Sequence, residues 1–273
     1  MLASCGTELF KLAKRPASWL LLAVALVLSL VFTYLAPYAA YLDGSGGVLS
    51  DRAFDQLRTS ELVGNSIGAL PVFLGAIALI LAVLVVGGEY GWGTWKTLLM
   101  QGPTRLAVYG GKLLALAVAT LVLVLALFTV GAVTSLLIAG AEAQPVDWPS
   151  LGELVVGVGA GWLIASMWAM LGVLLAVAYR GVALPIGLGL VWLLAVQNLL
   201  AAVVAPLLPW VADMQKALPG PNAGSLAAAL GSSPDTPGVA ELTGGGQATV
   251  VVAAYLVGFV VVAGALLRRR DVV

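Results

Sequence analysis

The sequence predicts an all-α membrane protein with six transmembrane helices and with both termini in the cytoplasm. Three observations predict this fold class: the composition, the lengths of the apolar runs and the distribution of charge. Hydrophobic residues make up 61% of the 273 residues and charged residues only 10%, whereas soluble domains carry about 25% charged residues. We therefore expect a single six-span transmembrane domain over residues 1–273 rather than one or two soluble domains.

Six apolar runs are long enough to cross a bilayer, whose hydrocarbon core of about 30 Å needs about 20 helical residues. The predicted spans are Trp19–Tyr38, Ala69–Gly87, Leu113–Ala139, Leu154–Ala178, Val182–Ala205 and Ala248–Leu267. The first run follows basic residues, as the core of a signal peptide does, but it exceeds the usual length of about 7–15 residues. No clean small-residue cleavage site follows it, so we expect this span to be retained.

The basic residues set the orientation, because Lys and Arg are retained on the cytoplasmic side of short loops. With the N-terminus inside, ten of the 13 basic residues are cytoplasmic: Lys11, Lys14, Arg15, Lys96, Arg105, Lys112, Arg180, Arg268, Arg269 and Arg270. Only Arg52, Arg58 and Lys216 fall outside. The acidic residues show the reverse distribution, with only Glu8, Glu89 and Asp271 inside. Both termini are therefore predicted to be cytoplasmic.

Two longer segments lie outside in this arrangement. Residues 41–68 contain DGSGG and then DRAFDQLRTSEL, whose apolar spacing allows a short surface helix. Residues 206–247 form an extracytoplasmic loop rich in Pro and Gly, with a modest helical piece at Ser225–Leu230. This loop can be a lid, a partner surface or a connection, and its irregular composition favours a connection.

The interiors of the predicted spans carry no ionisable residue, which disfavours a secondary transporter driven by protons or sodium. The polar residues there are Ser29, Thr33, Thr120, Thr129, Thr134, Ser135, Ser166, Gln197 and Asn198. Hydrogen bonding between helices is the favoured role for them, and the adjacent amides Gln197 and Asn198 are candidate substrate contacts. The motif GVGAG, Gly157–Gly161, predicts a close approach between helices.

Catalysis by this chain alone is not expected. The sequence contains no histidine and a single cysteine, Cys5, which excludes Ser-His and Cys-His nucleophiles and cysteine metal clusters. The step Gly111-Lys112 is followed by Leu113 and lacks the upstream glycine of a P-loop. We therefore assign no catalytic residue and no metal ligand, and an ATP-driven process would need another polypeptide to bind the nucleotide.

The stretch GGEYGWGTWKTLLMQGPTR, Gly87–Arg105, interrupts the apolar pattern between spans two and three. Trp92, Trp95, Leu98 and Leu99 recur at helical spacing and predict a short amphipathic helix. Gly102-Pro103 ends it. A helix lying at the lipid headgroups would show the same pattern, so helix geometry alone leaves its role open.

The chain resembles the permease subunits of type 2 ABC transporters, the ABC-2 family. The residues that carry the resemblance are Glu89, Gly93-Thr94, Leu98-Leu99, Pro103, Arg105 and Lys112, in the order E…GT…LL…P…R…K. The opening ELFKLAKRPASW, Glu8–Trp19, is similar to the amphipathic helix that leads into the first span in that family. Residues 1–18 are therefore expected to form an amphipathic cytoplasmic helix.

The resemblance implies that residues 88–105 are a coupling-helix region that docks in a cleft of an ABC ATPase subunit. It implies contacts with that subunit by Glu89, Trp92, Trp95, Leu98, Leu99, Pro103 and Arg105. ATP and Mg would be bound by the partner ATPase, with no cofactor in this chain. A second permease copy or a homologous permease and membrane lipid are the other expected partners. Nucleic acid is not, because the 13 basic and 13 acidic residues balance.

The expected function is thus the permease subunit of an ATP-driven exporter in the plasma (inner) membrane. An apolar, uncharged span interior suits a lipid-like, amphipathic or drug-like substrate. The alternatives are a non-transporting membrane scaffold or assembly factor, and a secondary transporter. A neighbouring ATPase reading frame would favour the transporter over the scaffold.

Overall fold

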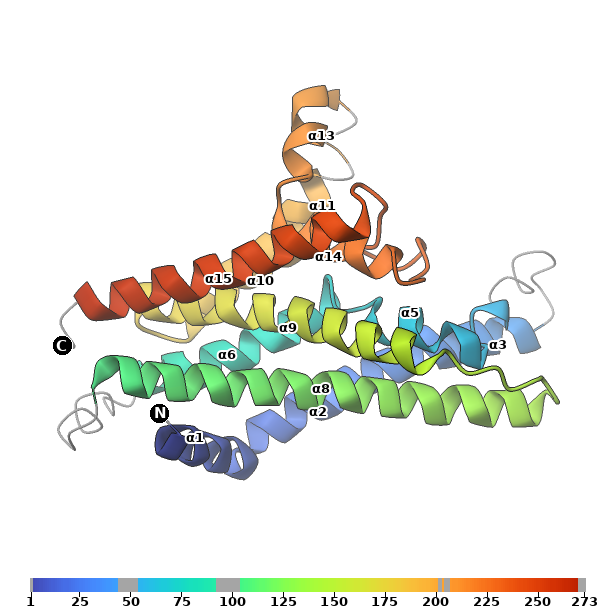
Figure 1. Cartoon of the computed structure of the whole chain (residues 1–273), viewed down its shortest axis with the longest axis horizontal. Helices are drawn as coiled ribbons and strands as arrows, with labels where there is room; N and C mark the ends of the chain where they lie inside the picture. The colour runs from blue at the N-terminus through green and yellow to red at the C-terminus, as the bar shows by residue number, and fades with distance from the viewer. Residues whose placement is uncertain (1, 44–53, 92–103, 201–202, 204–206, 270–273) are drawn as a thin grey trace.

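A computed structural model describes residues 2–43, 54–91, 104–200, 203 and 207–269. The regular elements in these residues are all helices, which confirms the predicted all-α class for the described part of the chain. Figure 1 shows the long helices lying side by side along one axis. The N-terminal half contributes α1 (Leu2–Lys14), α2 (Pro16–Ser29), η1 (Leu30–Leu35), α3 (Ala36–Leu42), η2 (Thr59–Glu61), α5 (Leu62–Ile67), α6 (Phe73–Gly91) and α8 (Arg105–Ala141). The C-terminal half contributes α9 (Leu151–Tyr179), α10 (Ala183–Leu190), η3 (Val191–Val196), α11 (Gln197–Leu199), α13 (Pro209–Gln215), α14 (Pro219–Ala228) and α15 (Gly245–Arg269).

Five helical stretches are long and apolar enough to cross a membrane. They are Pro16–Leu42, Phe73–Gly91, Arg105–Ala141, Leu151–Tyr179 and Gly245–Arg269. The predicted span Val182–Ala205 corresponds to Ala183–Leu199, a shorter apolar helix in which η3 is a π-helical turn. Because most of the residues after Leu200 that would lengthen it lie outside the described part, the count of six spans stays a prediction.

Local features explain where α8 and α9 begin and where α9 ends. Ser150 accepts a hydrogen bond from the backbone of Glu153, whose carboxylate in turn accepts one from the Ser150 amide, so a capping box starts α9. Arg180 ends α9 in the left-handed conformation, with φ of 51°. Thr104 starts α8, because its hydroxyl oxygen accepts from the Ala107 amide at 3.2 Å.

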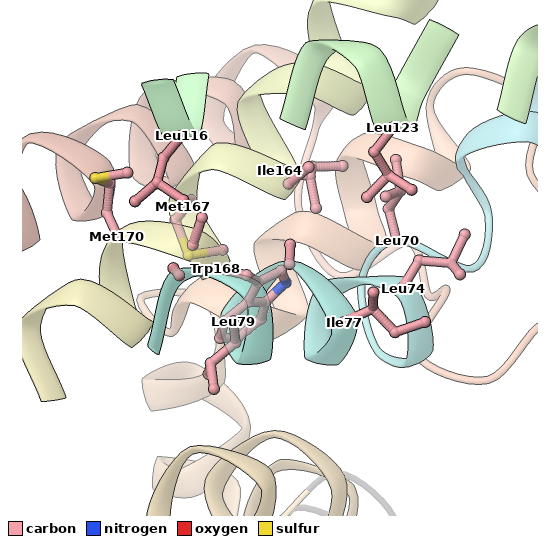
Figure 2. Packing of buried hydrophobic residues seen from close by; sticks show 14 of the residues in the cluster. Leu70, Leu74, Ile77, Leu79, Leu116, Leu123, Ile164, Met167, Trp168 and Met170 are labelled. Atoms are coloured by element: carbon pink, nitrogen blue, oxygen red, sulfur yellow. The ribbon is translucent and has the colours of Figure 1, made fainter. Parts of the chain in front are cut away.

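The core lies where α6 and α8 pack against α9, and its centre is the fully buried Trp168. Figure 2 shows Trp168 of α9 among the aliphatic side chains of α6, with Leu116 and Leu123 of α8 nearby. The close approach depends on glycine, because a Cβ at Gly75 would meet the Trp168 ring. The motif GVGAG behaves as predicted: a Cβ at Gly157 would meet Val63 and one at Gly161 would meet Ile67, both on α5.

The ends of the bundle differ. At one end, which we call the α1 end, α1 lies against the start of α8, and the last turns of α6 and α15 lie at the same end (Figure 1). At the opposite end, the α5 end, α14 packs against α5, α9 and α15. The Ser232 hydroxyl donates to the carbonyl of Gly64 at 2.7 Å, and the Gln56 amide donates to Ser233 at 3.2 Å. The segments 54–68 and 219–233 therefore form one packed unit.

The bounds of the helix expected in the second of these segments need correction. The helix expected at Ser225–Leu230 spans Pro219–Ala228 instead, because Pro219 occupies its first turn, where proline fits. The segment also packs into the protein: Asn222 and Ser225 are buried, and their side chains donate to the carbonyls of Lys216 and Ala240. These bonds replace the hydrogen bonds that backbone in a surface loop makes with water. The role of the segment as a lid, a partner surface or a connection stays a prediction.

Candidate functional site

Four charged side chains from three helices meet at the α1 end. Glu8 and Lys11 come from α1, Glu89 from the last turn of α6, and Lys112 from the early turns of α8. We call this set the ion cluster. The Lys112 ammonium lies 2.7 Å from Glu89 Oε1 and 3.0 Å from Glu8 Oε2. The Lys11 ammonium lies 2.8 Å from Glu8 Oε1 and 3.1 Å from Glu89 Oε1.

Local sequence explains this arrangement. Glu8 and Lys11 are three residues apart, so both point to the same side of α1. Gly111 lets α1 approach α8 closely, because a Cβ there would meet the Ser4 side chain. This contact places α1 directly beside Lys112. The glycine of the step Gly111-Lys112 therefore has a packing role.

The ion cluster is electrically balanced and mostly buried, since the Lys11 side chain is 32% exposed and the other three side chains are buried. Lys112 has no exposed side-chain surface, and the carboxylates of Glu8 and Glu89 are each 4% exposed. Isolated charges at such sites would be very unfavourable, but two carboxylates and two ammonium groups sum to zero. Removing one partner is therefore expected to cost more than the pairing itself contributes.

The environment shifts the titration of the two α1 residues in opposite directions. Burial by itself raises the pKa of Glu8, but attraction from Lys112 and hydrogen bonds from both lysines outweigh it, so this pKa lies below its ordinary value. Burial by itself lowers the pKa of Lys11, but hydrogen bonding to Glu8 and attraction from Glu89 outweigh it, so this pKa lies above its ordinary value. Both side chains are thus held in their charged forms around neutral pH.

The ion cluster joins the two helices that precede and follow residues 92–103 in the predicted coupling-helix region. Glu89 is on the helix that enters residues 92–103, and Lys112 is on the helix that leaves them. Trp92, Trp95, Leu98, Leu99 and Pro103, the predicted contact face for an ATPase, lie outside the described residues, so that face stays a prediction.

The two described members of the predicted partner-binding set lie in different environments. The Glu89 carboxylate is buried against the lysines of its own chain, a position that favours an internal anchoring role over direct contact with another protein. Arg105 is partly exposed at the first residue of α8, directly after the Thr104 cap.

Sequence reasoning did not predict the pairing of Glu8 and Lys11 with Glu89 and Lys112. A signal was present in the charge distribution, since only three acidic residues were assigned to the cytoplasmic side and two of them are in the ion cluster. What the sequence did not give was the position of α1 against α8, which depends on Gly111 and Ser4.

Gln197 and Asn198 do not form a joint site. The Gln197 side chain is buried against Gly220 of α14, and its amide nitrogen has no hydrogen-bond partner among the described residues. Asn198 is exposed and donates to the carbonyl of Leu194 in its own helix at 2.7 Å. Of the two candidate substrate contacts, only Gln197 offers an unused buried donor.

Comparison with known proteins identifies the part of the chain that contains the ion cluster. A family model described as "ABC-2 family transporter protein" matches residues 5–196, a range that includes all four residues of the ion cluster. No curated protein gives a match to the chain.

Proposed function

Since the chain belongs to the ABC-2 family of transporter proteins, we propose that it is the permease subunit of an ATP-driven exporter. Family membership makes it a multi-pass membrane subunit and not itself the ATPase. The proposal adds a separate ATPase that binds ATP and Mg, a second permease, a location in the plasma (inner) membrane and cytoplasmic termini. The substrate class that we propose is lipid-like, amphipathic or drug-like.

The observation that carries this proposal is the connection between the ion cluster and residues 92–103. Lys112 of α8 forms an ion pair with Glu89 of α6, and these are the two helices that flank this segment. Each of the two residues also forms an ion pair with a residue of α1. A force applied to the segment would therefore act on α1, α6 and α8 together. Such a linkage suits a segment that is moved by a partner, whereas a helix resting in lipid has no need of it.

The proposed mechanism is alternating access. Nucleotide binding closes the ATPase pair, the two coupling helices move together, and the permease bundles open toward the opposite side. In this scheme the ion cluster joins α1 to the flanking helices α6 and α8, and α9, which packs against α6, passes the movement on to α15.

Substitutions in residues 92–103 test this proposal. An apolar protein cleft demands a particular shape, whereas lipid accepts any apolar shape. Trp95→Leu should leave membrane insertion unchanged and weaken co-purification of the ATPase, and Leu98→Asp with Leu99→Asp should abolish it. Lys96→Ala, on the polar side, is the matched control. If the double Asp variant keeps its ATPase and couples hydrolysis to transport, the segment is not the coupling helix.

A membrane scaffold or assembly factor is the competing function. It predicts no ATPase in the neighbouring reading frame and no ATPase in the purified complex. Purification of the full chain with its co-eluting proteins distinguishes the two functions, because the exporter requires a stoichiometric ATPase.

A further inference from the structure

An apolar hollow of about 640 Å³ lies between α8, α9 and α15, away from the ion cluster. Leu114 and Ala117 line it from α8, Trp162 and Met170 from α9, and Leu256 and Val260 from α15. Its volume falls within the range of about 300–1,000 Å³ typical of small-molecule sites. The three helices therefore leave room for part of a ligand on the outside of the bundle.

The chemistry of the lining excludes a polar ligand inside the hollow. The indole N–H of Trp162 donates to the carbonyl of Ala117 at 2.8 Å. The hydroxyl of Ser166, which also lines the hollow, lies 3.1 Å from the hydroxyl of Thr120. Both polar groups are already bonded within the protein, so the hollow presents alkyl and aromatic surface, which suits a hydrocarbon chain.

A glycine on α9 borders the open space of the hollow. Gly159 lines it, and a Cβ built on Gly159 would have no atom within 4 Å. The same glycine and Leu163 also line an adjoining hollow of about 440 Å³ toward α14 and the start of α15. A flexible chain that enters beside Val260 can therefore extend past Gly159 toward the α5 end.

Two arginines at the end of α15 lie at a distance from the hollow that suits a lipid headgroup. Arg268 is two helical turns beyond Val260, about 12 Å at a rise of 1.5 Å per residue. Half of a bilayer hydrocarbon core is about 15 Å, so Arg268 and Arg269 would lie at headgroup level when an acyl chain fills the hollow. Both arginines are exposed.

We propose that this hollow is a binding site for an anionic phospholipid, with one acyl chain between α8, α9 and α15 and the phosphate near Arg268. Arg268 is the arginine closer to the Val260 face of α15, and Arg269 adds positive charge at the same depth. Apolar fit and charge complementarity act at opposite ends of one ligand. The arginines select the headgroup, because each basic residue near the surface attracts anionic lipid, and the hollow holds the chain. A bulk lipid neighbour would need neither feature.

Fluorescence quenching tests the site directly because Trp162 forms part of its wall. The full chain is purified in detergent and titrated with phosphatidylglycerol that carries brominated acyl chains, and in parallel with brominated phosphatidylcholine. The chain has eight tryptophans, so the signal from the site is the quenching that Trp162→Phe removes. We expect this component to saturate, at a lipid concentration roughly tenfold lower for phosphatidylglycerol than for phosphatidylcholine.

Two sets of variants separate the chain from the headgroup. Gly159→Leu fills the hollow and should remove the Trp162 component for both lipids. Gly258→Leu is its matched control, because Gly258 lies on α15 at a similar depth and a Cβ there also meets nothing within 4 Å. Arg268→Gln with Arg269→Gln, which changes only exposed side chains, should make the two lipids bind equally. Equal binding of both lipids to the native chain, or a Trp162 component that survives Gly159→Leu, would overturn the proposal.

Discussion

Lys112 of α8 and Glu89 of α6 form a 2.7 Å ion pair in which the lysine side chain has no exposed surface. The two residues are 23 positions apart in sequence (112 minus 89), and residues 92–103 lie between them. The pair therefore fixes the end of α6, which precedes this segment, to the early turns of α8, which follow it. Glu8 of α1 lies 3.0 Å from the same lysine, so the first helix of the chain is fixed to both.

The first prediction concerns the cost of leaving this pair incomplete. Lys112→Met should lower the free energy of unfolding by about 3–5 kcal/mol, because Lys11 would be the remaining cation of the ion cluster beside its two carboxylates. Lys112→Met with Glu89→Gln restores the charge balance and should recover part of the loss. Arg58→Gln is the control, since the Arg58–Asp55 pair is exposed and should contribute less than about 1 kcal/mol. Denaturant titration in detergent measures all three, and additive effects of the Lys112 and Glu89 changes would contradict the coupling.

The second prediction is the pH dependence of stability. Because the folded pKa of Glu8 lies below its ordinary 4.5, its contribution is present above pH 4.5 and is lost as the pH falls through the folded pKa. Because the folded pKa of Lys11 lies above its ordinary 10.5, its contribution is present below pH 10.5 and is lost as the pH rises through the folded pKa. The unfolding temperature should therefore show no dependence from these two groups at neutral pH. Glu8→Gln should flatten its acid limb, and an unchanged acid limb would show that other carboxylates dominate.

The third prediction compares two glycines of α6. Gly75→Ala should destabilise by about 1–3 kcal/mol, because the new methyl group would overlap the buried Trp168 ring. Gly88→Ala should stabilise by about 0.5–1 kcal/mol, because a Cβ there meets no atom within 4 Å and alanine is the better helix former. Thermal unfolding of the two variants checks the packing of α6 on α9. Equal effects at both positions would contradict it.

The fourth prediction concerns membrane orientation, for which charge is the only guide. In a Cys5→Ser background, cysteines placed at Gln144 and Asp235 should react with an impermeant reagent added to intact cells. Cysteines at Lys14 and Thr97 should react only after the cells are opened. Lys14 and Asp235 are exposed in the structure, so failure to react there cannot be ascribed to burial. Labelling of a cysteine at Thr97 from outside would show that the predicted topology is wrong.

The fifth prediction separates the two amides near α14. Gln197→Leu should keep or raise the unfolding temperature, because the buried amide nitrogen has no partner in the described residues. If Gln197 contacts the cargo, the same change should alter transport selectivity while basal ATPase activity persists. Asn198→Leu should change neither, since Asn198 is exposed and its side chain donates to the carbonyl of Leu194, one turn earlier along the chain. Loss of folded protein on Gln197→Leu would show that the amide has a packing role.

The sequence was sufficient for the helices whose formation depends on local physics. Apolar length fixed the spans represented by α6, α8, α9 and α15, and Ser150 with Glu153 shows how a local motif sets a helix start. The predicted close contacts at Gly157 and Gly161 were confirmed for the same reason. A pair of small residues lets another helix approach closely, whichever helix that is.

The ion cluster and the burial of α14 could not be predicted because each depends on distant segments. Lys112 becomes a buried residue only once Ser4 of α1 lies against Gly111. The turn-rich sequence around α14 is typical of a loop, and its burial requires Gly224 to contact the backbone of Gly238. Neither the contact of Ser4 with Gly111 nor that of Gly224 with Gly238 can be predicted from composition. The coupling face at Trp95 and its neighbours lies outside the described residues and stays a prediction.

The packed unit at the α5 end has a consequence for the order of events during synthesis. The hydrogen bond from Ser232 to Gly64 joins residues 168 positions apart, and the one from Gln56 to Ser233 joins residues 177 positions apart. A growing chain therefore emerges with α5 lacking its covering segment until most of the later helices have been inserted. Long-range contacts of this kind form late and leave apolar surface uncovered in the meantime. Chains truncated before residue 232 should consequently insert their early helices and yet be cleared by the quality-control proteases of the cell.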